Sequence, residues 1–464
     1  MPLPRSRRTL FAILAIAFVV RLGFAGLQFG DPLRGDPLSY YTIGRDLAAG
    51  DGYPSAAVGL YNLDQEAHGL PTVEVPASAF FPVGYPAVLG VLFATLEHSP
   101  LPDDDRSLTD AARLLNVALG TLVVFLTFRI GERLSGARAA AIGALAIALS
   151  PNLVAQSTNL HVEPLATAIL LTLLLVAMRT LDRGGLRHDA RPSTRALAGI
   201  GVLAGAGALV RPTSLLVVVA VVVALVVVGT PLRHLVRATT VLGVCALLAI
   251  APWTIRNAVQ LDTFVPISTG MADALCMSRN PDADGRYKNT AYCRIDPATT
   301  TPEAFEVAQY RANNDQAMSW VRSHPAREVE QWFWRTYWAF REDHDAVDAA
   351  RLGDHEASIA VAAADAWWFV LLAFGAIGIW RLARRDFAPA LIIAAAALLA
   401  TVPLQLHGEP RFKEPLVPLL AVLAAPAILA AVGPARSRRS RGSAGEQGAD
   451  PPQHHHEPDR RVEH

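Results

Sequence analysis

Two acidic residues, Asp36 and Glu163, stand where long apolar segments meet polar ones. Asp36 lies in a polar stretch just after the first apolar run, and Glu163 directly precedes Pro164 at the start of a later run. An ionised carboxylate at such a boundary can act as a general base that takes the proton from an attacking hydroxyl group. Asp36 suits this role, while Glu163 suits a second acidic group that binds a substrate or orients a partner residue.

Both residues also fit structural roles. Asp36 followed by Pro37 is typical of a helix N-cap and a favoured first helical residue, and Gly50 and Gly52 would end that helix about four turns later. Glu163 suits the first turn of a helix, where the helix dipole favours negative charge. The structural and catalytic interpretations are compatible, because a cap keeps a carboxylate ionised and oriented.

Basic side chains form a second group of candidates at the ends of apolar runs. Arginine offers a planar, bidentate fork to phosphate oxygens, so guanidinium and ammonium groups near a carboxylate suit a phosphate-bearing substrate. The alternative is salt bridging within a loop, for example between Arg411 and Glu409 or Glu414. The basic candidates are Arg211, Arg256, His407, Arg411 and Lys413.

Several common classes of function lack support in this sequence. Lys+Arg and Asp+Glu residues both number 41, so the net charge gives no indication of a nucleic-acid partner. We find no convincing P-loop, dinucleotide fingerprint, zinc motif or GxSxG nucleophile elbow. The run Asp103–Asp105 fits a solvated acidic turn better than a metal–nucleotide motif. The sequence thus gives no motif for a cofactor, and it leaves a divalent metal open.

The elements that must position these residues are membrane helices. Of 464 residues, 52% are hydrophobic and 18% are charged, the mean hydropathy is +0.30, and apolar residues form long runs. A helix needs roughly 20 apolar residues to cross the hydrocarbon core. The runs cover residues 10–29, 80–96, 111–130, 139–155, 164–178, 196–210, 213–228, 238–253, 367–380, 388–404 and 415–432. We therefore predict an all-α polytopic membrane protein.

The positions of basic residues predict the topology. Three arginines at positions 5, 7 and 8 precede the first run and place the N-terminus in the cytoplasm. The loops 129–138, 179–195, 233–237 and 381–385 are also basic. All of them are cytoplasmic only if run 80–96 does not span, and its two prolines and two glycines favour a juxtamembrane or re-entrant helix over residues 80–97. About ten transmembrane helices then remain.

This topology divides the chain into a transmembrane domain, residues 1–432, and a cytoplasmic tail, residues 433–464, whose composition predicts disorder. Two external loops result, 30–79 and 257–364. A single helix over 196–228 would be roughly 50 Å long, so we predict two helices with an outer break at Arg211–Thr213. The acidic and basic candidates all fall at the outer surface.

Two of the three cysteines, Cys276 and Cys293, lie in the external loop 257–364. Disulfides persist outside the cytoplasm, so we predict that these two cysteines pair. Two free loop thiols are the alternative. Cys245 lies in an apolar run and fits inert packing.

The order of several short motifs over residues 10–432 resembles bacterial GT-C glycosyltransferases. The similar branch is family 39, with protein O-mannosyltransferases and the lipid A aminoarabinose transferase. The motifs are Asp36 with Tyr40 and Gly50–Tyr53, Phe81–Pro86, Glu163–Pro164, Arg211–Thr213, Pro252–Asn257 with Phe264–Thr269, and Glu409–Pro415. The larger members of the family carry a C-terminal periplasmic domain, and this chain has its external mass in loop 257–364 instead.

The resemblance implies a transferase in the bacterial plasma membrane that takes a sugar from a polyprenyl-phosphate carrier on the extracytoplasmic face and inverts its anomeric centre. It implies that Asp36 is the catalytic acid/base residue, that Glu163 contributes to the site and that Arg411 contacts the carrier phosphate. Further candidates for binding substrate or phosphate are Tyr40, Arg211, Arg256, His407 and Lys413. The acceptor, a lipid, glycan or protein, is not identified, and both termini are expected in the cytoplasm.

Two other classes of function compete with glycosyl transfer. A polytopic transporter or lipid flippase also places charged residues at membrane boundaries. A transporter should carry ionisable groups near the midplane of broken helices, whereas here they gather at the outer surface. The third option is a scaffold without catalysis, in which Asp36 only caps its helix.

Overall fold

The computed structural model describes residues 5–53, 77–98, 104–183, 192–344, 354–382 and 387–432. Within these ranges every regular element is an α-helix or a short 3-10 helix, which confirms the predicted all-α class. The predicted disorder of the tail 433–464 falls outside the described ranges, as does the central part of the external loop 30–79.

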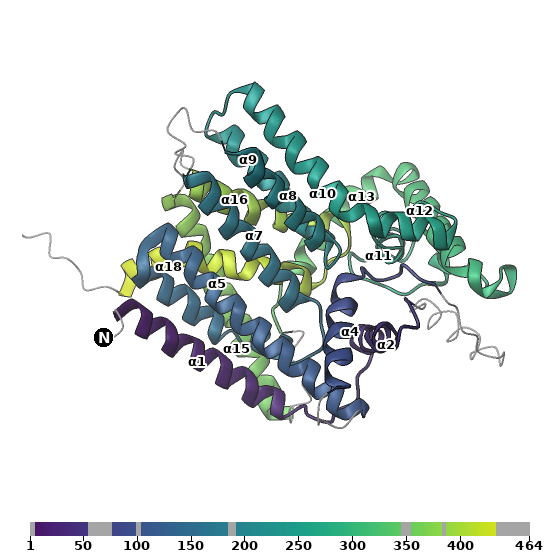
Figure 1. The fold of residues 1–464 in the computed structure, drawn as a ribbon, viewed down its shortest axis with the longest axis horizontal. Helices are drawn as coiled ribbons and strands as arrows, with labels where there is room; N and C mark the ends of the chain where they lie inside the picture. Colours follow the sequence, from purple (N-terminus) through teal and green to yellow (C-terminus); the bar gives the residue numbers. More distant parts are fainter. Residues whose placement is uncertain are drawn as a thin grey trace, which may run out of the picture.

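Most of the chain forms a bundle of apolar helices that run alongside one another (Figure 1). Among the residues that the structure describes, seven helices are long and apolar enough to cross a membrane, and the chain is a multi-pass membrane protein. The predicted number of about ten spans stays a prediction. The bundle helices are α1 (Arg5–Gly26), α5 (Asp105–Ala148), α7 (Glu163–Arg183), α8 (Thr194–Ala208), α9 (Leu216–Val227), α10 (Leu232–Leu261), α15 (Asp354–Leu382), α16 (Phe387–Ala400) and α18 (Val417–Val432).

Helix α5 contains the predicted run 111–130 and the first ten residues of the run 139–155, and it turns between them at Gly136. This residue has φ 81° and ψ 167°, which are not helical values. Gly131 then lies against Ala140, since a Cβ on Gly131 would sit 3.1 Å from the Ala140 Cα. The chain therefore folds back within α5, and a single glycine replaces most of the predicted loop because only glycine adopts this conformation without strain.

The predicted break near Arg211 separates α8 from α9. Helix α8 ends at Ala208, a 3-10 turn covers Pro212–Leu215, and α9 begins at Leu216. Glycines of α8 allow close contact with α10, as a Cβ on Gly201 would lie 2.6 Å from the Leu242 carbonyl oxygen. Two helix boundaries differ from the sequence prediction: α10 continues to Leu261 and α15 begins at Asp354, so both extend into the predicted external loop 257–364.

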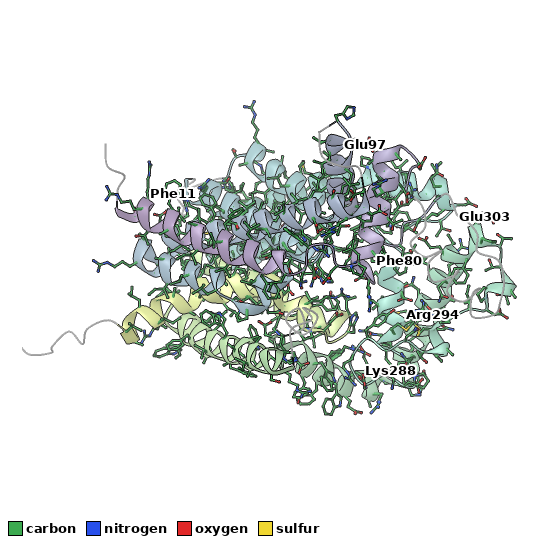
Figure 2. The ribbon with its side chains drawn as sticks, turned by 90° about the horizontal axis from the view of Figure 1, so that it is seen from below. Phe11, Phe80, Glu97, Lys288, Arg294 and Glu303 are labelled. Atoms are coloured by element: carbon green, nitrogen blue, oxygen red, sulfur yellow. A yellow bond between two sulfur atoms is a disulfide. The ribbon has the colours of Figure 1, made fainter. Side chains whose placement is uncertain are left out.

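A second group of elements gathers at one end of the bundle, on the right of Figure 1. The start of α1 lies at the other end, and Figure 2 likewise shows Phe11 of α1 far from Lys288, Arg294 and Glu303. The end elements are α2 (Asp36–Ala49), α4 (Gly84–Leu96), α6 (Pro151–Gln156), α11 (Gly270–Met277), α12 (Pro302–Ser323), α13 (Pro325–Phe340), α17 (Val402–Gln405) and 3-10 turns at Pro212–Leu215, Ala291–Cys293, Pro297–Thr299 and Pro410–Leu416.

Helices α2 and α4 pack against each other and fix the position of Asp36. At 13 residues, α4 is roughly 20 Å long, shorter than the hydrocarbon core of a bilayer. Gly44 allows the two helices to approach, because a Cβ there would lie 2.8 Å from the Leu89 Cβ. Tyr40 of α2 meets Tyr85 edge-on, with ring centroids 5.3 Å apart. The first turn of α2 is therefore held by a packed aromatic core.

Buried ion pairs join the segment 257–344 to the C-terminal helices. Arg335 of α13 is 0% exposed and donates to both oxygens of Glu328, at 2.7 and 2.8 Å. Arg279 donates to the same carboxylate at 3.0 Å, and both arginines also donate to the Leu404 carbonyl oxygen. This network fixes the chain just before residues 407–413. The structure also pairs Cys276 with Cys293, whose Cα atoms lie 5.8 Å apart.

Arg21, a charge within the first helix, lies inside the bundle. It is 1% exposed and donates to the Ser157 hydroxyl and to the carbonyl oxygens of Ile147 and Ala148. A charged group in an apolar bundle must be compensated by such polar partners. Arg21 therefore ties α1 to the second half of α5.

Candidate active site

Asp36 is the first residue of α2 and not its cap. The N-cap is Gly35, with φ 59°, and no side chain caps the helix. The sequence-based assignment of Asp36 as N-cap is therefore wrong: the left-handed Gly35 sets the start of the helix, and Pro37 occupies its second position. The expected helix end is confirmed, since Gly50 adopts a left-handed C-cap conformation. The Asp36 carboxylate is thus free to bind elsewhere.

The Asp36 carboxylate binds a guanidinium group from the far end of the chain. Arg411 Nη1 donates to Asp36 Oδ2 at 2.8 Å, and Arg411 Nε lies 2.6 Å from Glu409 Oε1. His407 Nε2 donates in turn to Glu409 Oε2 at 2.8 Å, because an ionised carboxylate can only accept. The salt bridge predicted between Arg411 and Glu409 is confirmed, and Arg411 also holds Asp36, while its contact with a carrier phosphate stays a prediction.

Glu409 remains ionised in this chain of contacts. Burial alone would raise the pKa of its carboxyl, but the Arg411 charge and the hydrogen bond from His407 outweigh burial and lower the pKa to about 2. Arg411 therefore contacts two carboxylate groups, those of Asp36 and Glu409.

We predict a specific pH dependence from this carboxyl group. An ordinary glutamate has a pKa of about 4.3, so ionised Glu409 stabilises the folded protein above roughly pH 4, and this contribution is lost as the pH falls toward 2. Glu409→Gln should therefore reduce the dependence of the unfolding temperature on pH between about 4 and 2. Thermal melts of purified protein at several pH values measure this, and a pH slope equal to that of the wild type would contradict it.

A second ion pair lies beside the first. Arg211 Nη1 donates to Glu163 Oε1 at 2.6 Å, and Glu163, the first residue of α7, is 2% exposed. The Phe412 ring lies near both arginines, with its centroid 5.3 Å from the Arg211 Cζ and 5.8 Å from the Arg411 Cζ. The break between α8 and α9 thus brings Arg211 to the start of α7, next to the Asp36 pair.

Asp36 and Arg411 line a cavity of about 430 Å³ at this end of the bundle. Its walls are formed by Gln28, Asp31, Pro32, Leu33, Arg34, Gly35, Asp36, Pro37, Arg113, Asn159, Leu160, His161 and Arg411. This volume lies in the range of small-molecule binding sites. The cavity can therefore hold a charged group and a sugar-sized ring next to the Asp36 carboxylate.

Three residues of this cavity were missed as candidates from sequence. Arg113 donates to Asp110 at 2.7 Å and to the Asp31 carbonyl oxygen at 2.8 Å. Arg34 is exposed and makes no hydrogen bond or ion pair within the described part of the chain. The position of Arg34, two residues before Asp36 in the same polar stretch, is a signal that could have identified it. The third residue is His161, which sequence alone favours as an ordinary interfacial histidine.

The remaining sequence candidates take different places. Tyr40 is buried, burial raises its pKa well above the ordinary value, and its ring lies 4.8 Å from that of Phe81. Tyr40 thus forms part of the packed support behind Asp36. His407 is 3% exposed and reaches the site through Glu409.

Arg256 and Lys413 are bound away from the Asp36 carboxylate. Arg256 donates to the carbonyl oxygens of Ser78 and Tyr53 and lies over the Trp253 ring, 4.8 Å from its centroid. Lys413 is 0% exposed, donates to carbonyl oxygens at the end of α13 and lies 3.3 Å from Asp343 Oδ1. The structure does not bring either residue together with Asp36 and Arg411. The charged groups of Arg256 and Lys413 are instead held by structural contacts. In the described ranges no three His, Cys, Asp or Glu side chains are grouped to hold a metal ion.

Comparisons with known proteins agree with this architecture. Residues 106–255, about a third of the chain, match the model of a family described as dolichyl-phosphate-mannose-protein mannosyltransferase. No curated protein matches the chain significantly.

Two solved structures are similar over most of the chain. One is the oligosaccharyltransferase AglB from Archaeoglobus fulgidus, in complex with an inhibitory peptide and a dolichol-phosphate, with a TM-score of 0.51, 14% identity, and 92% of this chain and 52% of that chain covered. The other is ArnT from Cupriavidus metallidurans bound to undecaprenyl phosphate, with a TM-score of 0.40, 17% identity, and 91% and 79% covered.

These matches support the resemblance drawn from the motifs. The family model describes a mannosyltransferase, AglB is an oligosaccharyltransferase, and the all-helical fold of this chain is similar to that of AglB. The chain spans about half the length of the oligosaccharyltransferase. At 14% identity the likeness to AglB concerns the fold.

Proposed function

We propose that the protein is an inverting glycosyltransferase that moves a sugar from a polyprenyl-phosphate carrier to an acceptor hydroxyl group, with Asp36 as the general base. The observation that carries the proposal is the position of Asp36. Its side chain is 34% exposed, lines the cavity of about 430 Å³, and binds Arg411 through Oδ2. Its Oδ1 has no hydrogen-bond partner among the described residues and is available to a substrate.

The proposed reaction follows from these contacts. The acceptor hydroxyl approaches Asp36 Oδ1, which takes its proton as the hydroxyl oxygen attacks the anomeric carbon. The bond between that carbon and the carrier phosphate oxygen breaks, and the phosphate leaves with the bonding electron pair. Attack on the face opposite the phosphate inverts the anomeric centre. The hydrogen bond from Arg411 holds the Asp36 carboxylate at the wall of the cavity.

The carrier phosphate would bind the guanidinium groups of the cavity. Arg34 has its full set of donors available, and Arg411 has one nitrogen, Nη2, without a partner in the described part of the chain. Arginine donors in a fixed fork bind phosphate oxygens more strongly than neutral donors do. The polyprenyl chain would then lie along the apolar helices of the bundle.

The active site would face the outside of the cell. The positive-inside pattern places the N-terminus in the cytoplasm, and the cavity lies at the end of the bundle away from the start of α1 (Figure 1). Relatives of the same fold support a lipid-phosphate donor, since AglB was solved with a dolichol-phosphate. The acceptor is a hydroxyl group of a lipid, glycan or protein.

A donor panel tests this proposal. Purified full-length protein is incubated with isotopically labelled polyprenyl-phosphate hexoses and pentoses and with membrane extract as the source of acceptor. We expect one donor to yield a labelled product by mass spectrometry, and its anomeric configuration, determined by NMR, to be opposite to that of the donor. A product with retained configuration would contradict inversion, and no product from any donor would contradict the transferase proposal.

A further inference from the structure

His161 makes incomplete contacts on the wall of the Asp36 cavity. Its side chain is 21% exposed, while Nδ1 is buried and has no hydrogen-bond partner among the described residues. This nitrogen lies 3.8 Å from Glu163 Oε2, a second buried atom without a partner. Buried polar atoms left unpaired are rare and costly, so a pair of them beside a cavity needs an explanation.

The orientation of the ring follows from these two atoms. Since Nδ1 is buried against Glu163 and His161 lines the cavity, Nε2 is the nitrogen that the ring presents to the cavity. A carboxylate only accepts hydrogen bonds, so the tautomer with the proton on Nδ1 is favoured. Burial lowers the pKa of His161 despite the nearby Glu163 carboxylate, so the ring is neutral and Nε2 is a hydrogen-bond acceptor.

We propose that His161 and Glu163 form a hydroxyl-binding subsite, in which His161 Nε2 accepts a hydrogen bond from a hydroxyl group of the donor sugar. The subsite rests on the proposed function and assigns the sugar-binding wall of the same cavity. Glu163 does not line that cavity and is held by Arg211 at 2.6 Å. Glu163 is thus a positioning residue that acts through His161. The 3.8 Å separation is of the kind that tightens when a ligand binds.

The donor sugar is the ligand whose hydroxyl groups can reach His161. Arg34 and Arg411 line the same cavity and suit the carrier phosphate. The sugar attached to that phosphate therefore lies in the remaining space, between these cations and His161. A neutral acceptor atom selects a hydroxyl group and gives no attraction to an anionic substituent. The subsite thus specifies a neutral sugar with a free hydroxyl group facing His161.

Binding measurements test the subsite without requiring turnover. Dissociation constants of full-length protein are measured for polyprenyl phosphate, for polyprenyl-phosphate mannose and for its 2-, 3-, 4- and 6-deoxy analogues. The variants are His161→Leu, which removes the acceptor, and His161→Gln, whose amide oxygen can replace it. His98→Leu is the matched control, because His98 is exposed and, within the described ranges, bonds only to the Ala94 carbonyl oxygen.

The expected results separate sugar binding from folding. Wild type should bind the mannosyl carrier more tightly than the bare carrier, and His161→Leu should reduce that preference roughly 10-fold while leaving the bare carrier unaffected. His161→Gln and His98→Leu should retain it. One deoxy analogue should bind wild type as weakly as the mannosyl carrier binds His161→Leu. As a single substitution, Glu163→Gln should reduce the preference for the mannosyl carrier. In the His161→Leu background it should cause no further reduction.

Three outcomes would overturn the subsite. They are a wild type without preference for the mannosyl carrier, an unchanged preference in His161→Leu, and an equal loss for both carriers in that variant. Failure of the subsite and failure of the transferase function give different results. A wild type whose sugar preference depends on His161, but which transfers no sugar, would retain the subsite and refute the transferase function.

Discussion

Replacing Asp36 by Asn is expected to lower kcat/KM for sugar transfer by roughly 10²- to 10⁴-fold. The Asn side chain has the same shape and keeps an oxygen that can accept from Arg411 Nη1, which lies 2.8 Å from the wild-type carboxylate. It loses the negative charge and with it the ability to take the acceptor proton. The measurement is the initial rate of transfer from a labelled polyprenyl-phosphate sugar by purified protein.

A matched control for this variant exists on the same segment. Asp51 is exposed, follows the C-cap of α2 and does not line the cavity. Asp51→Asn removes the same charge and should leave the rate unchanged. Wild-type turnover by Asp36→Asn would rule out Asp36 as the base. An equal loss in both variants would instead indicate that the charge of this segment matters, and not the proton transfer.

Local features of the site could be read from the sequence. Glycine after an apolar helix predicts its end, and Gly50 does end α2 in a left-handed conformation. An acidic residue before proline predicts a helix start, and Glu163 is the first residue of α7. Asp36 shows the limit of such reasoning, because Gly35 takes the cap position and releases the carboxylate into the cavity.

Pairings across long sequence distances could not be read in the same way. Asp36 and Arg411 are separated by 375 positions, and their hydrogen bond depends on how α2 and the turn at Pro410–Leu416 are placed by the whole bundle. Lys413 is also basic and lies two positions after Arg411, yet its side chain donates to the end of α13 and is buried there. Sequence position therefore identified the segment 407–413. It did not identify which basic residue of that segment reaches the cavity.

Contacts formed in the folded chain also decide the roles of two other residues. His161 has no local feature that distinguishes it from an interfacial histidine, and only the unpaired Nδ1 beside Glu163 marks it as a candidate. Arg256 matches a family motif, but its guanidinium group is occupied by the Ser78 and Tyr53 carbonyl oxygens. Only the folded chain shows how many donors of an arginine are already in use. An arginine whose donors are free can bind a phosphate, whereas one whose donors are in use has a structural role.

Arg411→Ala is expected to lower kcat/KM by roughly 10²-fold, because the variant loses two functions at once. The Asp36 carboxylate loses the group that orients it, and the carrier phosphate loses a charged donor. Glu409 would also be left without its cation. Arg286→Ala is the matched control, since Arg286 is exposed in the segment 257–344 and pairs with the neighbouring Asp284 at 2.9 Å.

A double-mutant cycle separates the two functions of Arg411. If Arg411 only orients Asp36, Arg411→Ala should have no further effect on donor binding in the Asp36→Asn background. If it also binds the phosphate, the Kd of the donor should rise in that background by roughly 10-fold, and the Kd of the bare polyprenyl phosphate should rise equally. We expect the second result, because Arg411 lines the cavity and its Nη2 has no partner in the described ranges. An unchanged Kd for both ligands would leave Arg34 as the phosphate-binding residue and restrict Arg411 to positioning the base.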